Sequence, residues 1–262
     1  MLGKLMKYEI KATARIFLPL YLVLIVFSII NSFMNFNMDS FTLPQGITLT
    51  IYIIILVGMF VATFIVMIQR FYKNLLSEEG YLMFTIPVKP WKHIISKLII
   101  SSMWTAISVL VAILSIGIIV LQEVSLTDMF KGISMIWSMV YEELGDSLYH
   151  LIAQMIVGII IGTATSILMV YASISMGHLS NNHKIMASIG SFLGFYALSQ
   201  IVAGILFLLP INSNQWLFYS FNAQMTQYPS GAIWGAIALS AVFASIYFII
   251  TNLILSKRLN LE

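Results

Sequence analysis

The sequence contains no cysteine and very little charge. Of its 262 residues, 9% are Asp, Glu, Lys or Arg, and 60% are hydrophobic. The missing cysteine excludes disulfides, thiol chemistry and cysteine-based metal sites. Soluble domains carry about 25% charged residues, so this chain cannot cover a water-exposed surface and lipid must solvate most of it. We therefore expect an all-α membrane protein.

Motifs for nucleotide hydrolysis and for metal-dependent proteolysis are also missing. The sequence has neither the Gly-x-x-x-x-Gly-Lys-Ser/Thr phosphate loop nor the zinc-binding helix motif His-Glu-x-x-His. Its four histidines lie at the ends of predicted spans or in loops, which favours interfacial positions over metal binding: His93, His150, His178 and His183. We predict no catalytic, cofactor-binding or metal-binding residue, and a protein that is not an enzyme.

Six apolar runs are long enough to cross the roughly 30 Å hydrocarbon core of a bilayer. The predicted spans are residues 16–33, 49–68, 98–121, 151–176, 185–209 and 232–255. None of them contains Asp, Glu, Lys, Arg or His. Ion-driven transporters usually need ionisable groups inside the membrane, although sodium sites can also be built from carbonyls and hydroxyls. The pattern argues against a proton- or sodium-coupled machine.

The basic residues predict the topology. Of the 13 Lys and Arg residues, only Lys131 falls in a segment that six spans would place outside. This positive-inside bias puts both termini in the cytoplasm. Residues 1–15 carry Lys4, Lys7, Lys11 and Arg15 at steps of three and four, which predicts a basic amphipathic helix lying in the interface. The alternative is a frayed basic tail that only sets the topology.

The outer segments carry acids and aromatic residues. Residues 122–150 hold five acids and one base, and Ser125 with Asp128 forms a possible helix-capping box. We expect a short helix on the outer face there. Residues 211–231 contain no Lys, Arg, Asp or Glu, and their aromatic composition is typical of an interfacial or re-entrant segment. Because no linker interrupts the chain, we predict a single membrane domain over residues 1–262.

The loop between the second and third spans carries the most specific pattern. Residues 79–88 read Glu-Gly-Tyr-Leu-Met-Phe-Thr-Ile-Pro-Val, and Lys97 precedes the next span. This stretch resembles the sequence after the second span in permease subunits of ABC-2-type transporters. The resemblance extends to the whole chain in its six-span layout and basic start, but the sharp motif covers only about ten residues.

The resemblance implies partners and a coupling helix. Permeases of this family work in pairs, each docked on a separate ATP-binding subunit that binds ATP and Mg²⁺. The short helix after the second span sits in a groove of that ATPase, and the link at residues 177–184 would make a second, smaller contact. Transferred to this sequence, the coupling helix would contain Ser77, Glu78, Glu79, Gly80, Tyr81, Leu82 and Phe84.

The resemblance also implies a cargo path between two permease copies, lined by the second and fifth spans. Such a path would be apolar with scattered hydroxyls, which suits an amphipathic or lipid-like cargo, and small permeases of this type often export toxic or antimicrobial peptides. For any single residue, simple helix packing is the favoured alternative. The candidate lining residues are Tyr52, Met59, Phe60, Thr63, Met67, Ser191, Phe195, Tyr196, Ser199 and Gln200.

The sequence thus predicts the permease subunit of an ATP-driven exporter in a bacterial cell membrane. Its partners would be two ATP-binding subunits, a second permease copy forming a homodimer, and lipid, with no nucleic acid. A passive channel or membrane scaffold without a motor is the alternative, in which the basic loop would only set the topology. A membrane-embedded enzyme lacks any catalytic cluster in this sequence.

Overall fold

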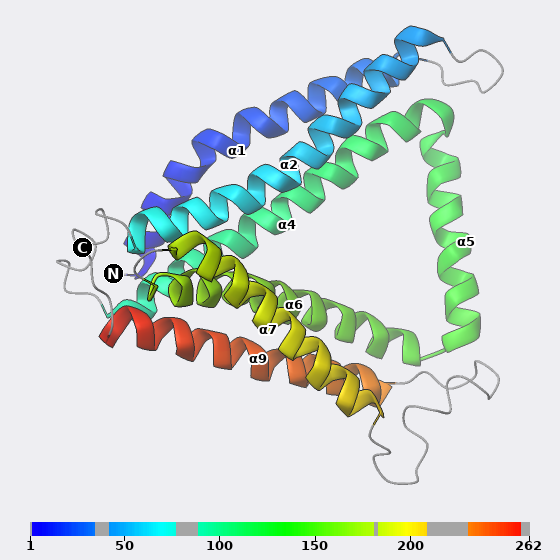
Figure 1. Cartoon of the computed structure of the whole chain (residues 1–262). Helices are drawn as coiled ribbons and strands as arrows, with labels where there is room; N and C mark the ends of the chain where they lie inside the picture. Colours follow the sequence, from blue (N-terminus) through cyan, green and yellow to red (C-terminus); the bar gives the residue numbers. More distant parts are fainter. Residues whose placement is uncertain (1, 35–41, 77–88, 181–182, 209–229, 258–262) are drawn as a thin grey trace. The chain divides into compact units, whose positions relative to one another are not determined.

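The computed structural model describes residues 2–34, 42–76, 89–180, 183–208 and 230–257, and its regular structure over these residues is entirely helical. Six of the helices are long and apolar enough to cross a membrane, which confirms the predicted all-α class and the number of spans. The helices are α1 (Leu2–Ser32), α2 (Leu43–Leu75), α4 (Pro90–Glu123), α5 (Leu126–Leu144), α6 (Ser147–Gly177), α7 (Lys184–Leu208) and α9 (Ser230–Lys257) (Figure 1).

The helices are longer than the apolar runs that predicted them. α1 continues without a break from Leu2 through Arg15 and Pro19 to Ser32, so the structure does not set residues 1–15 apart as a separate interfacial helix. α2 likewise extends past the predicted span to Leu75. The predicted coupling helix, residues 77–84, lies outside the described residues, as does most of the aromatic segment 211–231.

Contacts divide the chain into two compact units, and each unit combines stretches that are distant in sequence. The first unit comprises residues 1–70 and 95–135, and the second comprises residues 71–94 and 136–262. The last turn of α2 and the first turn of α4 therefore belong to the second unit, although the rest of both helices belongs to the first.

In the first unit, α1, α2 and α4 pack side by side (Figure 1). The buried residues of α1 recur every three or four positions: Thr13, Phe17, Tyr21, Leu24, Ser28 and Asn31. This spacing is the seam of helices that pack nearly parallel. Phe17 stacks on Trp104 of α4 with ring centroids 4.6 Å apart, so aromatic side chains fill the middle of the seam.

In the second unit, α6 packs on α9 and α7, and polar side chains cross between the helices. The Gln154 side-chain amide donates to the Ser230 carbonyl at 2.9 Å, and the Thr165 hydroxyl donates to the Ser240 carbonyl at 3.0 Å. Phe195 of α7 packs against Tyr247 of α9, with ring centroids 5.3 Å apart. Interhelical hydrogen bonds of this kind hold helices together where lipid removes the hydrophobic driving force.

Candidate functional site

One end of the predicted coupling loop is anchored by aromatic stacking. Phe71, in the last turn of α2, is fully buried and lies parallel to Tyr171 of α6, with ring centroids 4.0 Å apart and an angle of 9° between the planes. Leu75 and Leu76, the last described residues before the loop, are also buried. Offset or parallel aromatic contacts add to the burial of both rings. The chain therefore enters the loop from a fixed position on α6.

The other end of the loop is held in the same unit. His93 and Ile94, in the first turn of α4, are 3% and 0% exposed, and both belong with residues 136–262 by their contacts. Buried residues of the second unit therefore lie on both sides of the segment 77–88: Leu75 and Leu76 directly before it, and His93 and Ile94 a few residues after it. A displacement of the loop would act first on this unit.

The second predicted contact, the link at residues 177–184, meets the base of the loop. The ring of Tyr72 in α2 lies edge-on to the ring of His178, with centroids 6.1 Å apart and planes at 78°. His178 follows the last residue of α6, and its backbone N–H donates to the Ile174 carbonyl at 3.1 Å. The described parts of the two segments are therefore neighbours, although they are about a hundred residues apart in sequence.

The surroundings of His178 disfavour its protonated form. Burial lowers its pKa below the ordinary value, and the positive charge of Lys184 lowers it further. Its Nδ1 is buried and makes no hydrogen bond to any residue that the structure describes. These surroundings favour an aromatic contact with the Tyr72 ring over a charged one.

Gly177 allows α6 and α7 to approach closely at the link. A Cβ atom at this position would lie 2.5 Å from the backbone nitrogen and 2.6 Å from the Cα of Ser188. Only glycine fits such an approach without moving the backbone. The Gly158–Gly162 pair differs, because a Cβ on Gly158 would make an ordinary 3.6 Å contact with Ile237 and one on Gly162 would meet nothing within 4 Å.

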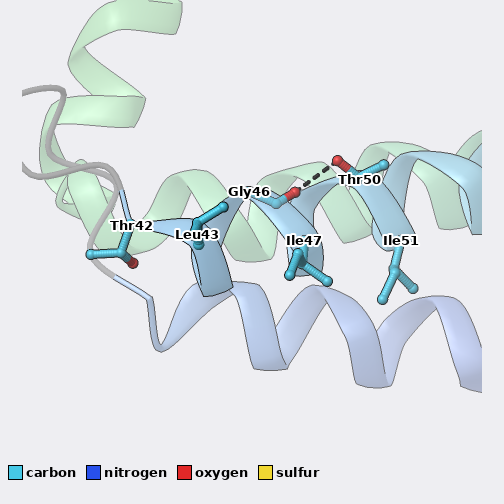
Figure 2. Close-up of a pocket in the computed structure, with 6 residues that line it drawn as sticks. All are labelled: Thr42, Leu43, Gly46, Ile47, Thr50 and Ile51. Carbon is cyan, nitrogen blue, oxygen red and sulfur yellow. Dashed lines mark hydrogen bonds between the residues drawn. The ribbon is translucent and has the colours of Figure 1, made fainter.

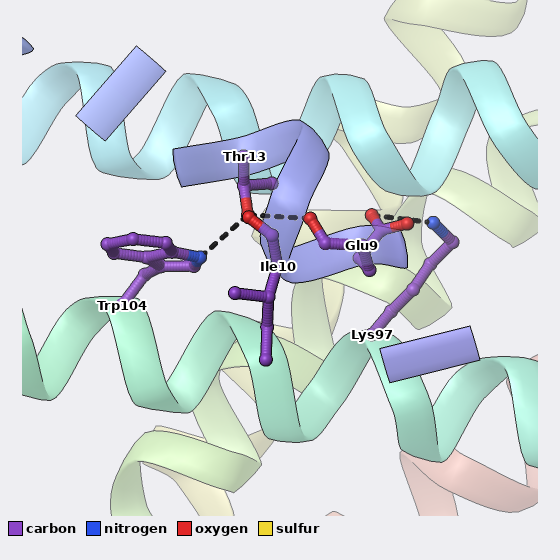
Figure 3. A network of polar contacts seen from close by, with 5 residues as sticks. All are labelled: Glu9, Ile10, Thr13, Lys97 and Trp104. Carbon is purple, nitrogen blue, oxygen red and sulfur yellow. Dashed lines mark hydrogen bonds and ion pairs between the residues drawn. The ribbon is translucent and has the colours of Figure 1, made fainter. Parts of the chain in front are cut away.

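A separate polar network ties the start of α1 to α4 in the first unit (Figure 3). The Lys97 ammonium donates to the Glu9 carboxylate at 3.1 Å, and these side chains are 5% and 11% exposed. One turn along α1, the Trp104 indole N–H donates to the Thr13 hydroxyl at 2.7 Å, and that hydroxyl donates to the Glu9 carbonyl at 2.8 Å. The basic N-terminal segment is thus fixed to a membrane-spanning helix through its one acid.

The candidate path residues of α2 divide between the interior and the surface of the first unit. Tyr52, Met59 and Thr63 are buried. The Tyr52 and Ser115 hydroxyls are 2.8 Å apart, and the Thr63 and Ser108 hydroxyls are 3.1 Å apart. Phe60 is 37% exposed, and Met67 is half-buried. Helix packing within the unit accounts for the three buried side chains.

The candidate path residues of α7 lie in the second unit. Tyr196 is 51% exposed and Gln200 is also exposed, whereas Ser191, Phe195 and Ser199 are half-buried. None of the side chains described between Lys184 and Ile205 is buried. A membrane-spanning helix with this much free surface has room for lipid or for another subunit. That the candidate residues of α2 and α7 line a cargo path stays a prediction.

Sequence reasoning missed the polar side chains that join α1, α2 and α4. The Tyr21 and Ser108 hydroxyls are 2.8 Å apart, and the Ser28 hydroxyl donates to the Ser115 carbonyl. The sequence contained a repeat that could have indicated them, because Tyr21 and Ser28 are seven residues apart and so are Ser108 and Ser115. Hydroxyl-bearing residues repeated every seven positions mark one packing face of a membrane helix.

A shallow apolar groove lies at the opposite end of α2 from the predicted coupling loop (Figure 2). Its lining comes from Thr42 and the first turns of α2, where the Thr50 hydroxyl donates to the Gly46 carbonyl at 2.7 Å. Thr42 also caps the helix, since its N–H and hydroxyl both donate to the Gln45 side chain. A groove built from one helix terminus has no convergent polar groups to hold a ligand.

Searches against family models, characterised proteins and solved structures found no match to this chain.

Proposed function

We propose that this chain is the permease subunit of an ATP-driven exporter, working as a pair with a second copy and with two separate ATP-binding subunits. The observation that best supports the proposal is the contact of Tyr72 with His178. It joins the base of the loop that resembles a coupling helix to the link that the same resemblance gives as the second ATPase contact. A loop that only set the topology would not need this connection.

The contacts at the start of the loop would transmit a movement of the ATP-binding subunit to the membrane helices. ATP and Mg²⁺ would bind to the partner subunit, and closure of that subunit would move residues 77–84. Phe71 stacked on Tyr171 passes the displacement to the end of α6, where nearly every side chain from Val170 to Ser175 is buried. Densely packed helices transmit a shift rather than absorb it. α7 follows α6 because the two approach closely at Gly177.

The cargo is proposed from the character of the exposed membrane helices. α7 offers Tyr196 and Gln200 on an otherwise apolar surface, and polar groups facing hydrocarbon without a partner are costly. A second copy covering this surface would satisfy them and would enclose an uncharged path. An amphipathic or hydrophobic molecule, including a toxic or antimicrobial peptide, fits such a path.

Co-purification tests the proposal. The tagged chain is expressed with the genes that neighbour its own, extracted in mild detergent, and the bound proteins are identified. We expect a stoichiometric P-loop ATPase that is lost from the Glu79→Arg and Tyr81→Ala variants. Glu143→Arg is the matched control, because it makes the same charge change on α5, at an exposed position. A homo-oligomer that retains no ATPase, although one is present in the membranes, would instead indicate a passive channel or scaffold.

A further inference from the structure

α5 carries an exposed apolar stripe, which another part of the described chain meets at Tyr141, where the ring of Tyr149 lies edge-on to it. Its residues recur at helical spacing along one side of the helix, and each is between 41% and 64% exposed: Leu126, Phe130, Ile133, Ile136, Trp137 and Tyr141. No residue of α5 is buried. The opposite side carries Thr127, Lys131, Ser138 and Glu142, with the exposed side chains of Met135 and Met139 among them. The helix is therefore strongly amphipathic, and its apolar side needs a cover.

The connections at its two ends fix how α5 can lie. Only Val124 and Ser125 separate it from α4, and only Gly145 and Asp146 separate it from α6. If α4 and α6 cross the membrane as successive spans, both ends of α5 are held at the same bilayer surface. A helix of 19 residues is about 28 Å long at about 1.5 Å per residue. With both ends at one surface, it must lie along that surface rather than project from it.

Local structure at both ends supports sharp changes of direction. The Ser125 hydroxyl accepts a hydrogen bond from the Asp128 N–H at 3.1 Å and donates to its carboxylate at 2.7 Å, which starts the helix. This confirms the Ser125 half of the predicted capping box, whereas the Asp128 carboxylate meets the Ser125 hydroxyl rather than its backbone N–H. At the other end, Gly145 has φ of 55°, the left-handed conformation that ends helices. The chain turns out of α4 and into α6 within two residues each time.

We propose that α5 is an interfacial helix whose apolar stripe inserts among the lipid chains of the leaflet opposite the start of α1. Lipid is the expected cover, because the short connections to α4 and α6 hold the stripe at the depth where headgroups and acyl chains meet. Trp137 and Tyr141 lie on the stripe, and Trp and Tyr favour this depth of a bilayer. The inference rests on six spans and not on coupling to an ATPase.

The charges on α5 define the kind of lipid surface it fits. Its polar side carries Asp128, Glu142 and Glu143 against Lys131 alone, and Lys131 is itself paired with Asp128 at 3.3 Å. Basic interfacial helices are drawn to anionic headgroups, whereas α5 has no net positive charge to attract them. Its insertion depends on apolar area and should persist in zwitterionic lipid and at high salt.

Single cysteines provide the test, since the chain has none of its own. Ile133→Cys and Trp137→Cys place a nitroxide label on the stripe, and Ser138→Cys and Glu142→Cys are matched controls on the polar side. The full-length variants are reconstituted in phosphatidylcholine vesicles, and collisions with oxygen, which concentrates in lipid, are compared with collisions with a water-soluble nickel complex. Unchanged thermal stability shows which labelled variants are folded.

We expect oxygen collisions to exceed nickel collisions at least several-fold at the two stripe positions, and the reverse at the two controls. The difference should be the same when a third of the lipid is phosphatidylglycerol. Equal nickel access at all four positions would overturn the proposal in favour of a helix standing in water. Protection of the stripe from both reagents would overturn it in favour of a protein cover. Neither result depends on whether an ATPase co-purifies.

Discussion

At the scale of single residues, Gly177 leaves the least room for a side chain among the glycines that the structure describes. We expect Gly177→Ala to destabilise the protein by about 1–3 kcal/mol, as overpacking of a close contact does, because the new methyl group would overlap the Ser188 backbone. Thermal unfolding in detergent measures the effect. Gly162→Ala is the control, since its methyl group would meet nothing within 4 Å. Equal melting temperatures for the two variants would contradict the close approach.

His178 should make stability depend on pH. Its pKa is lowered from the ordinary value of 6.5 by burial and then by Lys184, so the unfolded chain takes up the proton at a higher pH than the folded chain does. Stability from this group is complete above about pH 6.5 and falls as the pH drops through the lower, folded pKa.

The measurement is the melting temperature between pH 7.5 and 5, compared with that of His178→Gln. We expect the wild type to lose more stability than the variant over this range, and Lys184→Gln to shrink the difference, because it removes a charge that disfavours protonation. Parallel curves for the wild type and His178→Gln would show that the imidazole titrates normally.

At the scale of the helices, the Glu9–Lys97 pair fixes α1 to α4. Removing one partner leaves the other charge buried, which costs about 3 kcal/mol or more. We expect Lys97→Met and Glu9→Gln each to lower the melting temperature, and the double variant to be less destabilised than the sum of the two. A double-mutant cycle on detergent-solubilised protein measures this coupling. Strictly additive effects would show that the pair contributes nothing to the fold.

Some features of the helices could be predicted from the sequence, and others could not. The six spans and the capped α5 were predictable, because apolar length and the Ser125–Asp128 box are local patterns. The continuation of α1 through Arg15 was not, since it depends on Glu9 meeting Lys97 across the fold. The predicted third span begins at residue 98, which places Lys97 at the membrane interface. In the structure Lys97 pairs with Glu9, which lies 88 residues away in the sequence.

The same limit applies to the candidate site. The two segments predicted to be cytoplasmic were chosen from a resemblance and from topology, and the contact between Tyr72 and His178 joins residues with no shared local pattern. Tyr52, Met59 and Thr63 were chosen as polar or bulky members of a span. Tyr52 and Thr63 meet Ser115 and Ser108 of α4, and these partners lie on another helix and could not be read from the span itself.

At the scale of the whole molecule, the distribution of charge predicts an orientation that can be measured. All basic residues except Lys131 lie on the side predicted to be cytoplasmic, and the bias of Lys and Arg orients multi-span proteins. In intact cells, a membrane-impermeant maleimide should label Ser134→Cys, on the exposed surface of α5, but not Lys11→Cys or His183→Cys. After the cells are opened, all three should react, which shows that the thiols are accessible.

Labelling of His183→Cys in intact cells would show that the protein has the opposite orientation. The ATPase proposal would then fail as well, because the link beside Tyr72 would face away from any cytoplasmic ATP.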